Sequence, residues 1–355
     1  MSKLEQNLKK IAKDPLAIRS LYFENYDDEI PKQVAQCLNL EKLSIAYSDI
    51  LKIPQFVSEL PKLKSFDFCG CRDLDWVTNL AEYSELKTLG AHCKTIGQVE
   101  QIAELTQLEH LTITGNVRQL PQNFSQLKNL QSLELFALPL KTLPNVLSEL
   151  ADLKTLSVNT GDSSLDFDEV VAVLKQCQKL ASLKLVTSNL KLNEKISALQ
   201  QLKKLDLSGN GLQKIPTELY QLHELTELDL GLNQLHNVPK GIGQLSNLKV
   251  LKLNSNWQNK IDLINLMNEL HQFTKLKTLH LWSCQSLKQL PSNISACTQL
   301  QELDVDNNLL IDVPDSLYEM YWLKKLRLTT NPIQNDTKQE LRDWAEQNAV
   351  RLSVD

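Results

Sequence analysis

Residues 202–216 read LKKLDLSGNGLQKIP, and residues 225–239 repeat the pattern as LTELDLGLNQLHNVP. Both segments follow one spelling, Leu-x-x-Leu-x-Leu-x-x-Asn-x-Leu, and both end in an aliphatic residue and a proline. The two copies are offset by 225 − 202 = 23 residues. A fixed short period of this kind predicts a solenoid, in which each repeat is one structural unit stacked on the next.

The pattern recurs along almost the whole chain. Numbering each copy from its first leucine-type residue gives about 14 repeats, which start at Ile18, Leu40, Leu63, Leu86, Leu108, Leu130, Leu153, Leu180, Leu202, Leu225, Leu248, Leu276, Leu300 and Leu323. Most starts are 22 to 24 residues apart, whereas the repeats at Leu153 and Leu248 are 27 and 28 residues long. Only these two repeats therefore carry sizeable insertions.

The positions within a repeat predict its local structure. Leucines at the fourth and sixth positions, such as Leu205 and Leu207, lie on one side of a short strand, and the fifth residue lies on the other side. Stacking the strands in parallel joins these leucines into one continuous core. The proline that ends the pattern suits the first turn of a short outer helix or 3₁₀ segment, because it fixes φ and lacks an N–H.

The ninth position of the repeat carries an asparagine where the chain turns inward after the strand. Its amide is predicted to satisfy backbone groups that would otherwise be buried without partners. The asparagines at this position are Asn116, Asn210, Asn233, Asn256, Asn308 and Asn331.

With these positions in place, the chain resembles the leucine-rich repeat proteins, specifically the short-repeat type with a Leu-Pro step that bacterial and Ras-suppressor-like proteins share. The resemblance covers roughly residues 18–333. It implies an α/β fold: a curved, horseshoe-like solenoid with a parallel β-sheet on its concave side and short helical or 3₁₀ segments on its convex side. It implies almost nothing about the partner.

The two ends depart from the repeat pattern. Residues 1–17 have an apolar face at helical spacing, which predicts an N-terminal helical cap; its members are Leu4, Leu8, Ile11 and Leu16. Residues 334–355 predict a C-terminal cap, with Asp336 or Thr337 at the start of a helix that turns Leu341 and Trp344 towards the core. Val350, Leu352 and Val354 alternate as in a last edge strand. The repeats at 18–333 and both caps are predicted to form a single structural domain.

Composition favours a soluble, cytoplasmic protein. Among 355 residues, 42% are hydrophobic and 23% charged, which is ordinary soluble usage. The net charge of −5 disfavours a nucleic-acid backbone as the main partner, and it equally disfavours an anionic membrane surface. The first 20 residues contain no uninterrupted apolar run, so neither a signal peptide nor membrane insertion is expected. Secretion by a leaderless route would leave no mark in this sequence.

The seven cysteines fall mostly in structural positions. Cys37, Cys177 and Cys297 each precede a repeat start by three residues, a position that leucine fills elsewhere, and Cys71 and Cys284 occupy the ninth position. Cys69 and Cys93 are placed on or near the inner face. No second Cys/His pair follows at zinc-site spacing, so we expect reduced thiols and neither a metal nor another cofactor.

The two long repeats are predicted to form fuller outer helices, at 168–175 and 261–270. The simpler interpretation is that the fold tolerates repeats of different length. The sharper hypothesis is that the loops at 160–167 and 257–260 project beside the inner face and help to define a binding site.

Residues that the core does not dictate carry the prediction of function. The third, fifth and seventh positions of each repeat point out of the inner sheet and are free to meet a partner. Phe136, Val186 and Trp282 are predicted to present apolar side chains to water, as interface anchors do. Four aspartates are predicted to form an acidic track flanked by lysine and arginine, a mixed pattern suited to orienting a protein partner. The predicted partner-binding residues are Glu134, Phe136, Lys184, Val186, Asp206, Asp229, Lys252, His280, Trp282, Asp304, Asp306 and Arg327. An ordinary solvated surface is the alternative.

Catalytic motifs are absent from the sequence, since it contains no His-Glu-x-x-His, Gly-x-Ser-x-Gly, phosphate loop or dinucleotide fingerprint. His280 and Cys284 lie close in sequence, but Cys284 occupies a structural position. The sequence therefore predicts a non-enzymatic scaffold that binds a protein partner through its concave face. Three alternatives stay open: a leaderless bacterial effector or adhesin acting on host proteins, a small-ligand or glycan receptor, and an enzyme with an unrecognised site.

Overall fold

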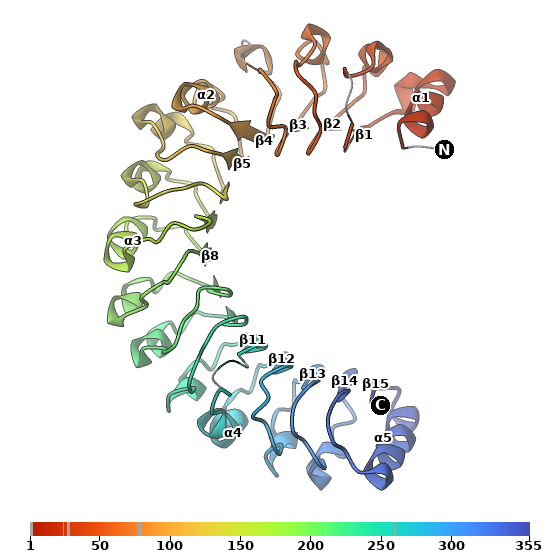
Figure 1. Cartoon of the computed structure of the whole chain (residues 1–355), viewed down its shortest axis with the longest axis vertical. Coiled ribbons are helices and arrows are strands. Elements are labelled where there is room, and N and C mark those ends of the chain that lie inside the picture. Colours follow the sequence, from red (N-terminus) through yellow and green to blue (C-terminus); the bar gives the residue numbers. More distant parts are fainter. Residues whose placement is uncertain (1–2, 24, 27–28, 77–79, 257, 259) are drawn as a thin grey trace. The chain divides into compact units, whose positions relative to one another are not determined.

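The computed structural model describes residues 3–23, 25–26, 29–76, 80–256, 258 and 260–355. The chain divides into two compact units by its internal contacts. Unit 1 contains residues 1–165 and 172–180, and unit 2 contains residues 166–171 and 181–355. Within each unit, short strands lie on one side and helical segments on the other (Figure 1).

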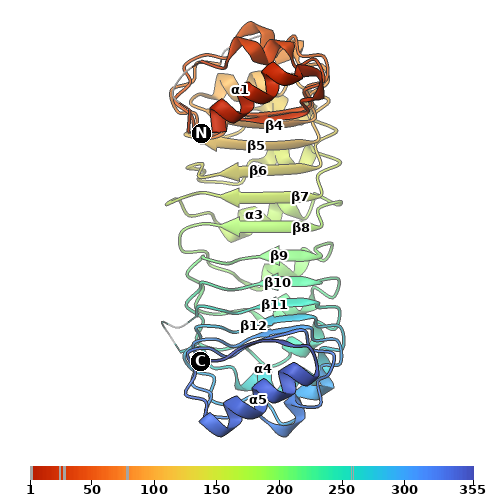
Figure 2. The same ribbon diagram turned by 90° about the vertical axis from the view of Figure 1, so that its right-hand side faces the viewer.

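The strands of each unit are parallel, and each pairs with its neighbour in sequence (Figure 2). In unit 1 they are β1 (Ser20–Tyr22), β2 (Lys42–Ser44), β3 (Ser65–Asp67), β4 (Thr88–Cys93), β5 (His110–Gly115), β6 (Ser132–Phe136) and β7 (Thr155–Asn159). In unit 2 they are β8 (Ser182–Val186), β9 (Lys204–Asp206), β10 (Glu227–Asp229), β11 (Val250–Lys252), β12 (Thr278–His280), β13 (Glu302–Asp304), β14 (Lys325–Arg327) and β15 (Arg351–Ser353). Every strand from β1 to β14 begins two residues after one of the repeat starts that the sequence suggests.

The segments opposite the strands are short. The α-helices are α1 (Lys3–Lys13), α2 (Ile96–Ile102), α3 (Phe167–Leu174), α4 (Ile264–Glu269) and α5 (Asn335–Gln347). The 3₁₀ segments are η1 (Pro15–Ala17), η2 (Lys32–Gln36), η3 (Gln55–Val57), η4 (Leu80–Glu82), η5 (Gln122–Gln126), η6 (Asn145–Glu149), η7 (Glu194–Ala198), η8 (Thr217–Gln221), η9 (Ile242–Gln244), η11 (Leu270–Gln272), η12 (Ile294–Ala296) and η13 (Asp315–Leu317). Parallel strands with short outer helical segments confirm the predicted fold class.

The repeat prolines lie one residue earlier than the first helical turn. Pro31, Pro54, Pro121, Pro144, Pro216 and Pro314 each occupy the N-cap position, immediately before a 3₁₀ segment. Their backbone is extended there or close to it, for example at Pro216 with φ −68° and ψ 141°. A proline N-cap needs no N–H and lets the next residue begin the helical turn, so the predicted role holds with a shift of one position.

The core follows from the alternation of residues along each strand. The fourth- and sixth-position leucines are buried, as shown by Leu205 and Leu207 on β9 and by Leu228 and Leu230 on β10. The intervening fifth residue points the other way, because successive side chains of a strand alternate between faces. The solvent-facing side of the strands is called the inner face below.

Buried asparagines connect successive turns of unit 2. The Nδ2 of Asn233 donates to the carbonyls of Leu207 at 3.0 Å and Leu230 at 3.0 Å, while its Oδ1 accepts from the N–H groups of Asn210 and Leu212, both at 3.0 Å. The same arrangement recurs with variations at Asn210, Asn256, Asn308 and Asn331. These five residues form an asparagine ladder, which satisfies backbone groups that water cannot reach.

Asn116 is not part of such a ladder. Its side chain is exposed. Strand β5 runs on to Gly115, whose φ of 119° is open to glycine but rarely to other residues, and Val117 is buried in place of the asparagine. The ninth-position prediction is therefore wrong for this repeat, because an extended strand and a glycine turn displace the residue outward.

All seven cysteines are buried, and none of them forms a disulfide. At the ninth position, the Sγ of Cys71 lies 2.9 Å from the carbonyl of Ile45, and the Sγ of Cys284 lies 3.5 Å from that of Leu253. These thiols replace asparagine as donors to the turn. The inner-face placement of Cys93 is wrong, because this residue is fully buried at the end of β4.

The ends and the long repeats differ in detail from the sequence prediction. Ile11 of α1 is buried, but Leu16 is exposed because the helix ends at Lys13. Helix α5 begins at Asn335 after an N-cap at Gln334, so neither Asp336 nor Thr337 caps it. Thr337 is instead buried, and its hydroxyl donates to Asp312 at 2.9 Å.

Other features of these segments are confirmed. Leu341 and Trp344 are buried under α5, and β15 pairs in parallel with β14. Helix α3 matches the predicted outer helix to within a residue, whereas α4 is shorter than predicted and continues as η11.

Candidate interaction surface

The inner face of unit 2 carries the fifth-position residues in one continuous row. Strand register aligns each with the next, from β8 to β14. The row, called the inner row below, consists of Lys184, Asp206, Asp229, Lys252, His280, Asp304 and Arg327. Seven of the twelve predicted residues are thus neighbours in the folded chain.

Opposite charges of the inner row pair sideways between strands. Lys184 Nζ lies 3.3 Å from Asp206 Oδ2, and Lys252 Nζ lies 3.1 Å from Asp229 Oδ2. Arg327 Nε lies 3.6 Å from Asp304 Oδ2 and 2.9 Å from Asp306 Oδ2. The aspartates therefore do not form an uncompensated acidic track, because each one has a cationic neighbour.

The second carboxylate oxygen of the row aspartates is held by the chain itself. Asp206 Oδ1 accepts from the backbone N–H of Ser208 at 2.9 Å, and Asp229 Oδ1 accepts from that of Gly231 at 3.0 Å. Asp304 Oδ1 accepts from the N–H of Asp306 at 3.2 Å. Short aspartate side chains readily make such bonds two residues ahead, which fixes the turn after each strand.

The acidic and basic side chains of the inner row differ in how far they are exposed to solvent. The aspartate side chains of the row are 9–28% exposed, whereas those of the lysines and of Arg327 are 39–52% exposed. A molecule that approaches the row meets ammonium and guanidinium groups first, with the carboxylates beneath them.

The C-terminal end of the row is a denser ionic cluster on β12, β13 and β14. Glu302 Oε1 lies 2.7 Å from Lys325 Nζ and 3.3 Å from His280 Nε2, and the histidine contact lacks hydrogen-bond geometry. Partial burial raises the pKa of the Glu302 carboxyl, but Lys325 and His280 outweigh it and the net pKa lies below its usual value. Burial dominates at Asp304 and holds the pKa of that carboxyl above its usual value.

The apolar anchors are less exposed than predicted in unit 2. Val186 and Trp282 were predicted to present their side chains openly to water, but both are half-buried. Leu232, which the sequence prediction did not single out, is 61% exposed. It lies at the eighth position in the left-handed conformation, with φ 54°, which turns its side chain outward. The same conformation occurs at the eighth position of other repeats, where Tyr47 is 65% exposed but Ser255 is buried.

The predicted residues of unit 1 lie on β6. Phe136 is 46% exposed, in agreement with its prediction, and Glu134 Oε2 accepts from Thr112 Oγ1 at 3.5 Å. Tyr22 and Tyr47 are also exposed in this unit and were not singled out from the sequence. The exposure of Tyr22 could have been predicted from the sequence, since it occupies a fifth position. The exposure of Tyr47 could not, because it depends on the turn after the strand.

The structure describes the loop at 160–167 in full and the loop at 257–260 in part. Trp257 and Asn259 lie outside the described residues, and Lys260 is exposed. In the other loop Thr160 and Leu165 are buried, and Thr160 Oγ1 donates to the Ser163 carbonyl at 2.6 Å. A role of either loop in binding stays a hypothesis.

A Cys284–His280 pair has no catalytic geometry in unit 2. Cys284 is fully buried with its thiol on a backbone carbonyl, and burial raises its pKa to about 12. Within the described ranges, no group of three or more His, Cys, Asp or Glu side chains is arranged to hold a metal ion.

The repeated strands, the outer 3₁₀ segments and the asparagine ladder define the chain as a solenoid repeat protein. A family model described as leucine rich repeat matches residues 200–257. The chain is a leucine-rich repeat protein. In the described part of the chain every helix is too short or too polar to span a bilayer.

Curated relatives share part of the chain. The human volume-regulated anion channel subunit LRRC8B is 30% identical over 227 residues, which are 61% of this chain and 27% of the relative. The flightless-1 homolog of Caenorhabditis elegans is 26% identical over 218 residues, which are 53% of this chain and 17% of the relative. The chain thus spans only a minor part of the length of these relatives.

Solved structures match over nearly the full chain. A leucine-rich repeat protein of Leptospira interrogans aligns with a TM-score of 0.62 and 24% identity, covering 98% of each chain. An internalin of Listeria monocytogenes aligns with a TM-score of 0.59 and 20% identity, covering 100% of this chain and 94% of the internalin. At this identity the similarity concerns the fold.

Proposed function

We propose that this protein is a non-enzymatic scaffold that binds a protein partner through the inner face of unit 2. The observation that carries the proposal is the inner row, whose charged side chains are aligned by strand register and whose aspartates are fixed from two sides. A surface held in this way loses little side-chain freedom when a partner docks, so more of the interaction energy appears as affinity.

A protein partner agrees better with this surface than a nucleic acid does. Solved structures of the same fold include a Toll–Spatzle complex and a TLR13–ssRNA13 complex, so the fold alone does not choose between them. The inner row mixes acidic and basic side chains, and the whole chain carries a net charge of −5. Phosphate recognition needs a basic surface that neutralises many charges in succession, whereas a row of mixed charges suits a protein surface of complementary pattern.

A reducing compartment such as the cytoplasm is part of this proposal. Its support is that all seven cysteines are buried outside disulfides, whereas secreted proteins typically use cysteine in disulfides.

The test is quantitative crosslinking and capture from the native host with three inner-face residues replaced by alanine: Lys252, Trp282 and Arg327. The matched control replaces three exposed residues of the outer side of unit 2, Lys240, Gln244 and Glu319. We expect the inner-face variant to lose the proteins that wild type and control enrich, with an unchanged circular dichroism spectrum. Equal capture by wild type, the inner-face variant and the control variant would contradict the proposal.

A further inference from the structure

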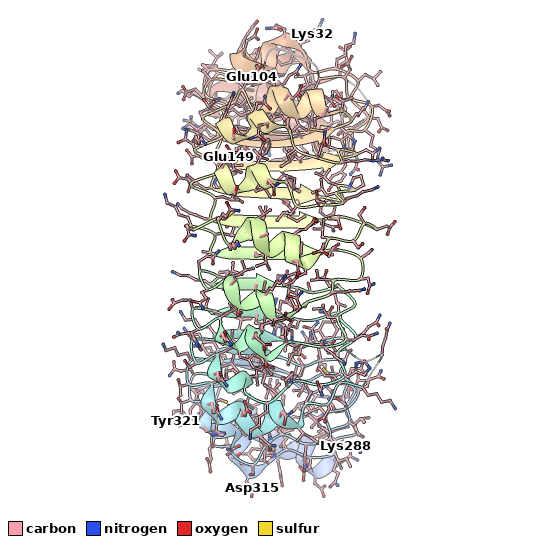
Figure 3. The ribbon with its side chains drawn as sticks, turned by 90° about the vertical axis from the view of Figure 1, so that its left-hand side faces the viewer. Lys32, Glu104, Glu149, Lys288, Asp315 and Tyr321 are labelled. Carbon is pink, nitrogen blue, oxygen red and sulfur yellow. The ribbon has the colours of Figure 1, made fainter. Side chains whose placement is uncertain are left out.

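A pocket of about 360 Å³ lies towards the C-terminal end of unit 2, outside the inner row. It opens between the loops that lead into three neighbouring strands, β13, β14 and β15. Its lining comes from residues 298–299, 301, 321–324 and 348–349. Tyr321 lies at one edge of the ribbon, whereas Lys288 lies at the opposite edge (Figure 3). Pockets of this size hold a small molecule or the end of a longer ligand.

Tyr321 presents an aromatic ring to solvent in this pocket. The residue is 73% exposed, more than any other large hydrophobic residue in the part of the chain that the structure describes. The two preceding repeats carry threonine at the equivalent position, as Thr274 and Thr298, so the stacking of repeats does not require an aromatic residue there. Isolated surface aromatics are normal, but this one borders a pocket with several polar side chains around it.

Trp322 holds the neighbouring ring of Tyr321 in place. The indole Nε1 donates to the carbonyl of Cys297 in the preceding repeat at 3.2 Å. The centroids of the Tyr321 and Trp322 rings are 5.0 Å apart, and the ring planes are inclined at 79°, which is an edge-to-face arrangement. The pair therefore offers a flat ring face to a ligand rather than a slot between two parallel rings.

The polar side chains of the pocket are available to a ligand. Within the described residues, neither Gln299 nor Gln301 makes a side-chain hydrogen bond, and the exposed ammonium group of Lys324 has no ion pair. Asn348 donates through Nδ2 to the carbonyl of Trp344 at 2.9 Å, which leaves its Oδ1 available. No carboxylate of the described residues lines the pocket. A carboxamide both donates and accepts, so these side chains suit a ligand whose polar groups do the same.

A sugar ring matches both the aromatic face and the carboxamides. A pyranose with equatorial hydroxyls, such as glucose in a β-linked chain, carries C–H bonds on its faces and hydroxyls around its edge. The C–H hydrogens bear a partial positive charge and are attracted to the negative face of an aromatic ring. Each hydroxyl donates and accepts, as a carboxamide does. A proline-rich segment also presents flat rings to aromatic side chains, but it has no N–H to donate to the amide oxygens.

We propose that this pocket binds a saccharide of glucose-like configuration. One face of a sugar ring stacks on Tyr321, and the hydroxyls at its edge bond to Gln299, Gln301 and Lys324. None of these residues belongs to the inner row, so failure of this inference would leave the proposed function untouched.

Saturation-transfer difference NMR of cellohexaose, a β-linked glucose oligomer, with the full chain tests this proposal. Saturation should reach the ring C–H protons of the sugar, and the signal should saturate on titration. Tyr321→Ala should weaken binding roughly three- to tenfold because the aromatic contact is lost, whereas Tyr321→Phe should retain most of the affinity. Gln299→Leu should also weaken binding, because a hydroxyl of the sugar then loses its partner.

Tyr47→Ala is the matched control, since Tyr47 is 65% exposed but belongs to unit 1, and it should leave binding unchanged. Hexaproline is the control ligand and should bind more weakly than cellohexaose. The proposal is overturned if cellohexaose does not bind, or if Tyr321→Ala and Tyr47→Ala have the same effect. It is also overturned if hexaproline binds more tightly than cellohexaose with dependence on Tyr321, because the pocket would then be a peptide site.

Discussion

Replacing Asn233 by alanine tests the asparagine ladder as a source of stability. The Oδ1 of Asn233 is the acceptor for two buried backbone N–H groups, those of Asn210 and Leu212. The carbonyls that its Nδ2 serves keep other donors, since Asn210 Nδ2 also reaches Leu207 O at 2.8 Å and Asn256 Nδ2 reaches Leu230 O at 3.1 Å. The variant therefore leaves two N–H groups without partners.

Each buried donor without a partner costs about 1–3 kcal/mol, so Asn233→Ala should lower the free energy of unfolding by about 2–6 kcal/mol. Asn256 accepts from one such group, Leu235 N at 3.1 Å, and Asn256→Ala should lose about half as much, roughly 1–3 kcal/mol. Asn116→Ala is the control, because this exposed side chain should change stability by less than about 0.5 kcal/mol.

The assay is urea unfolding followed by circular dichroism, together with amide hydrogen exchange across β9 and β10, since a stack of repeats need not unfold in one step. Exchange should accelerate around Asn210 and Leu212 in the Asn233 variant. The reasoning is refuted if Asn233→Ala and Asn116→Ala are equally stable, or if the order of Asn233 and Asn256 is reversed.

Three further predictions concern the core, the ionic cluster and the thiols. Leu228→Ala should lower stability by about 2–5 kcal/mol, as for other buried leucines, and a loss below 1 kcal/mol in urea unfolding would argue against a close-packed core there. Glu302 and Asp304 should give pH dependences of opposite sign. Because the pKa of Glu302 is lowered in the folded protein, its ionised carboxylate stabilises the fold above the usual pKa range of glutamate, and this stability is lost on acidification; Glu302→Gln should therefore become less stable relative to wild type as pH rises through that range. The pKa of Asp304 is raised, so Asp304→Asn should become more stable relative to wild type as pH rises. Melting temperatures of the two variants that shift in the same direction with pH would contradict both assignments. The buried thiols should resist Ellman's reagent in the folded protein and react only after unfolding in urea, because burial raises the pKa of Cys71, Cys177 and Cys297 to about 11; rapid labelling of the native protein would contradict their burial.

Side-chain parity made most of the inner row predictable from the sequence. A leucine at the fourth and sixth positions dictates where the fifth residue points, so Asp206, Asp229 and Lys252 could be assigned to one face without coordinates. The state of their charges could not be assigned in this way. Whether a carboxylate is free or paired depends on the residue opposite it on the next strand and on the backbone N–H two residues ahead. Both depend on interatomic distances, which only the folded structure gives.

Turns and insertions were less predictable for a physical reason. Asn116 is an asparagine at the ninth position of its repeat, yet Gly115 and the longer strand β5 displace it from the core. Leu232 looks like an ordinary leucine in sequence, but a left-handed backbone directs it into solvent. Such outcomes depend on local φ and ψ, which a residue pattern constrains weakly.

The sequence by itself determined that this chain is a stack of leucine-rich repeats, because a period of about 23 residues leaves each leucine stripe no partner except the next repeat. Only the tertiary structure decided what the stack offers to other molecules. It joined the carboxylates of the inner row to neighbouring cations, and it formed a groove beside α4. Burial of apolar side chains follows from periodicity along the chain, whereas ion pairing and grooves depend on distances between residues 20 or more positions apart.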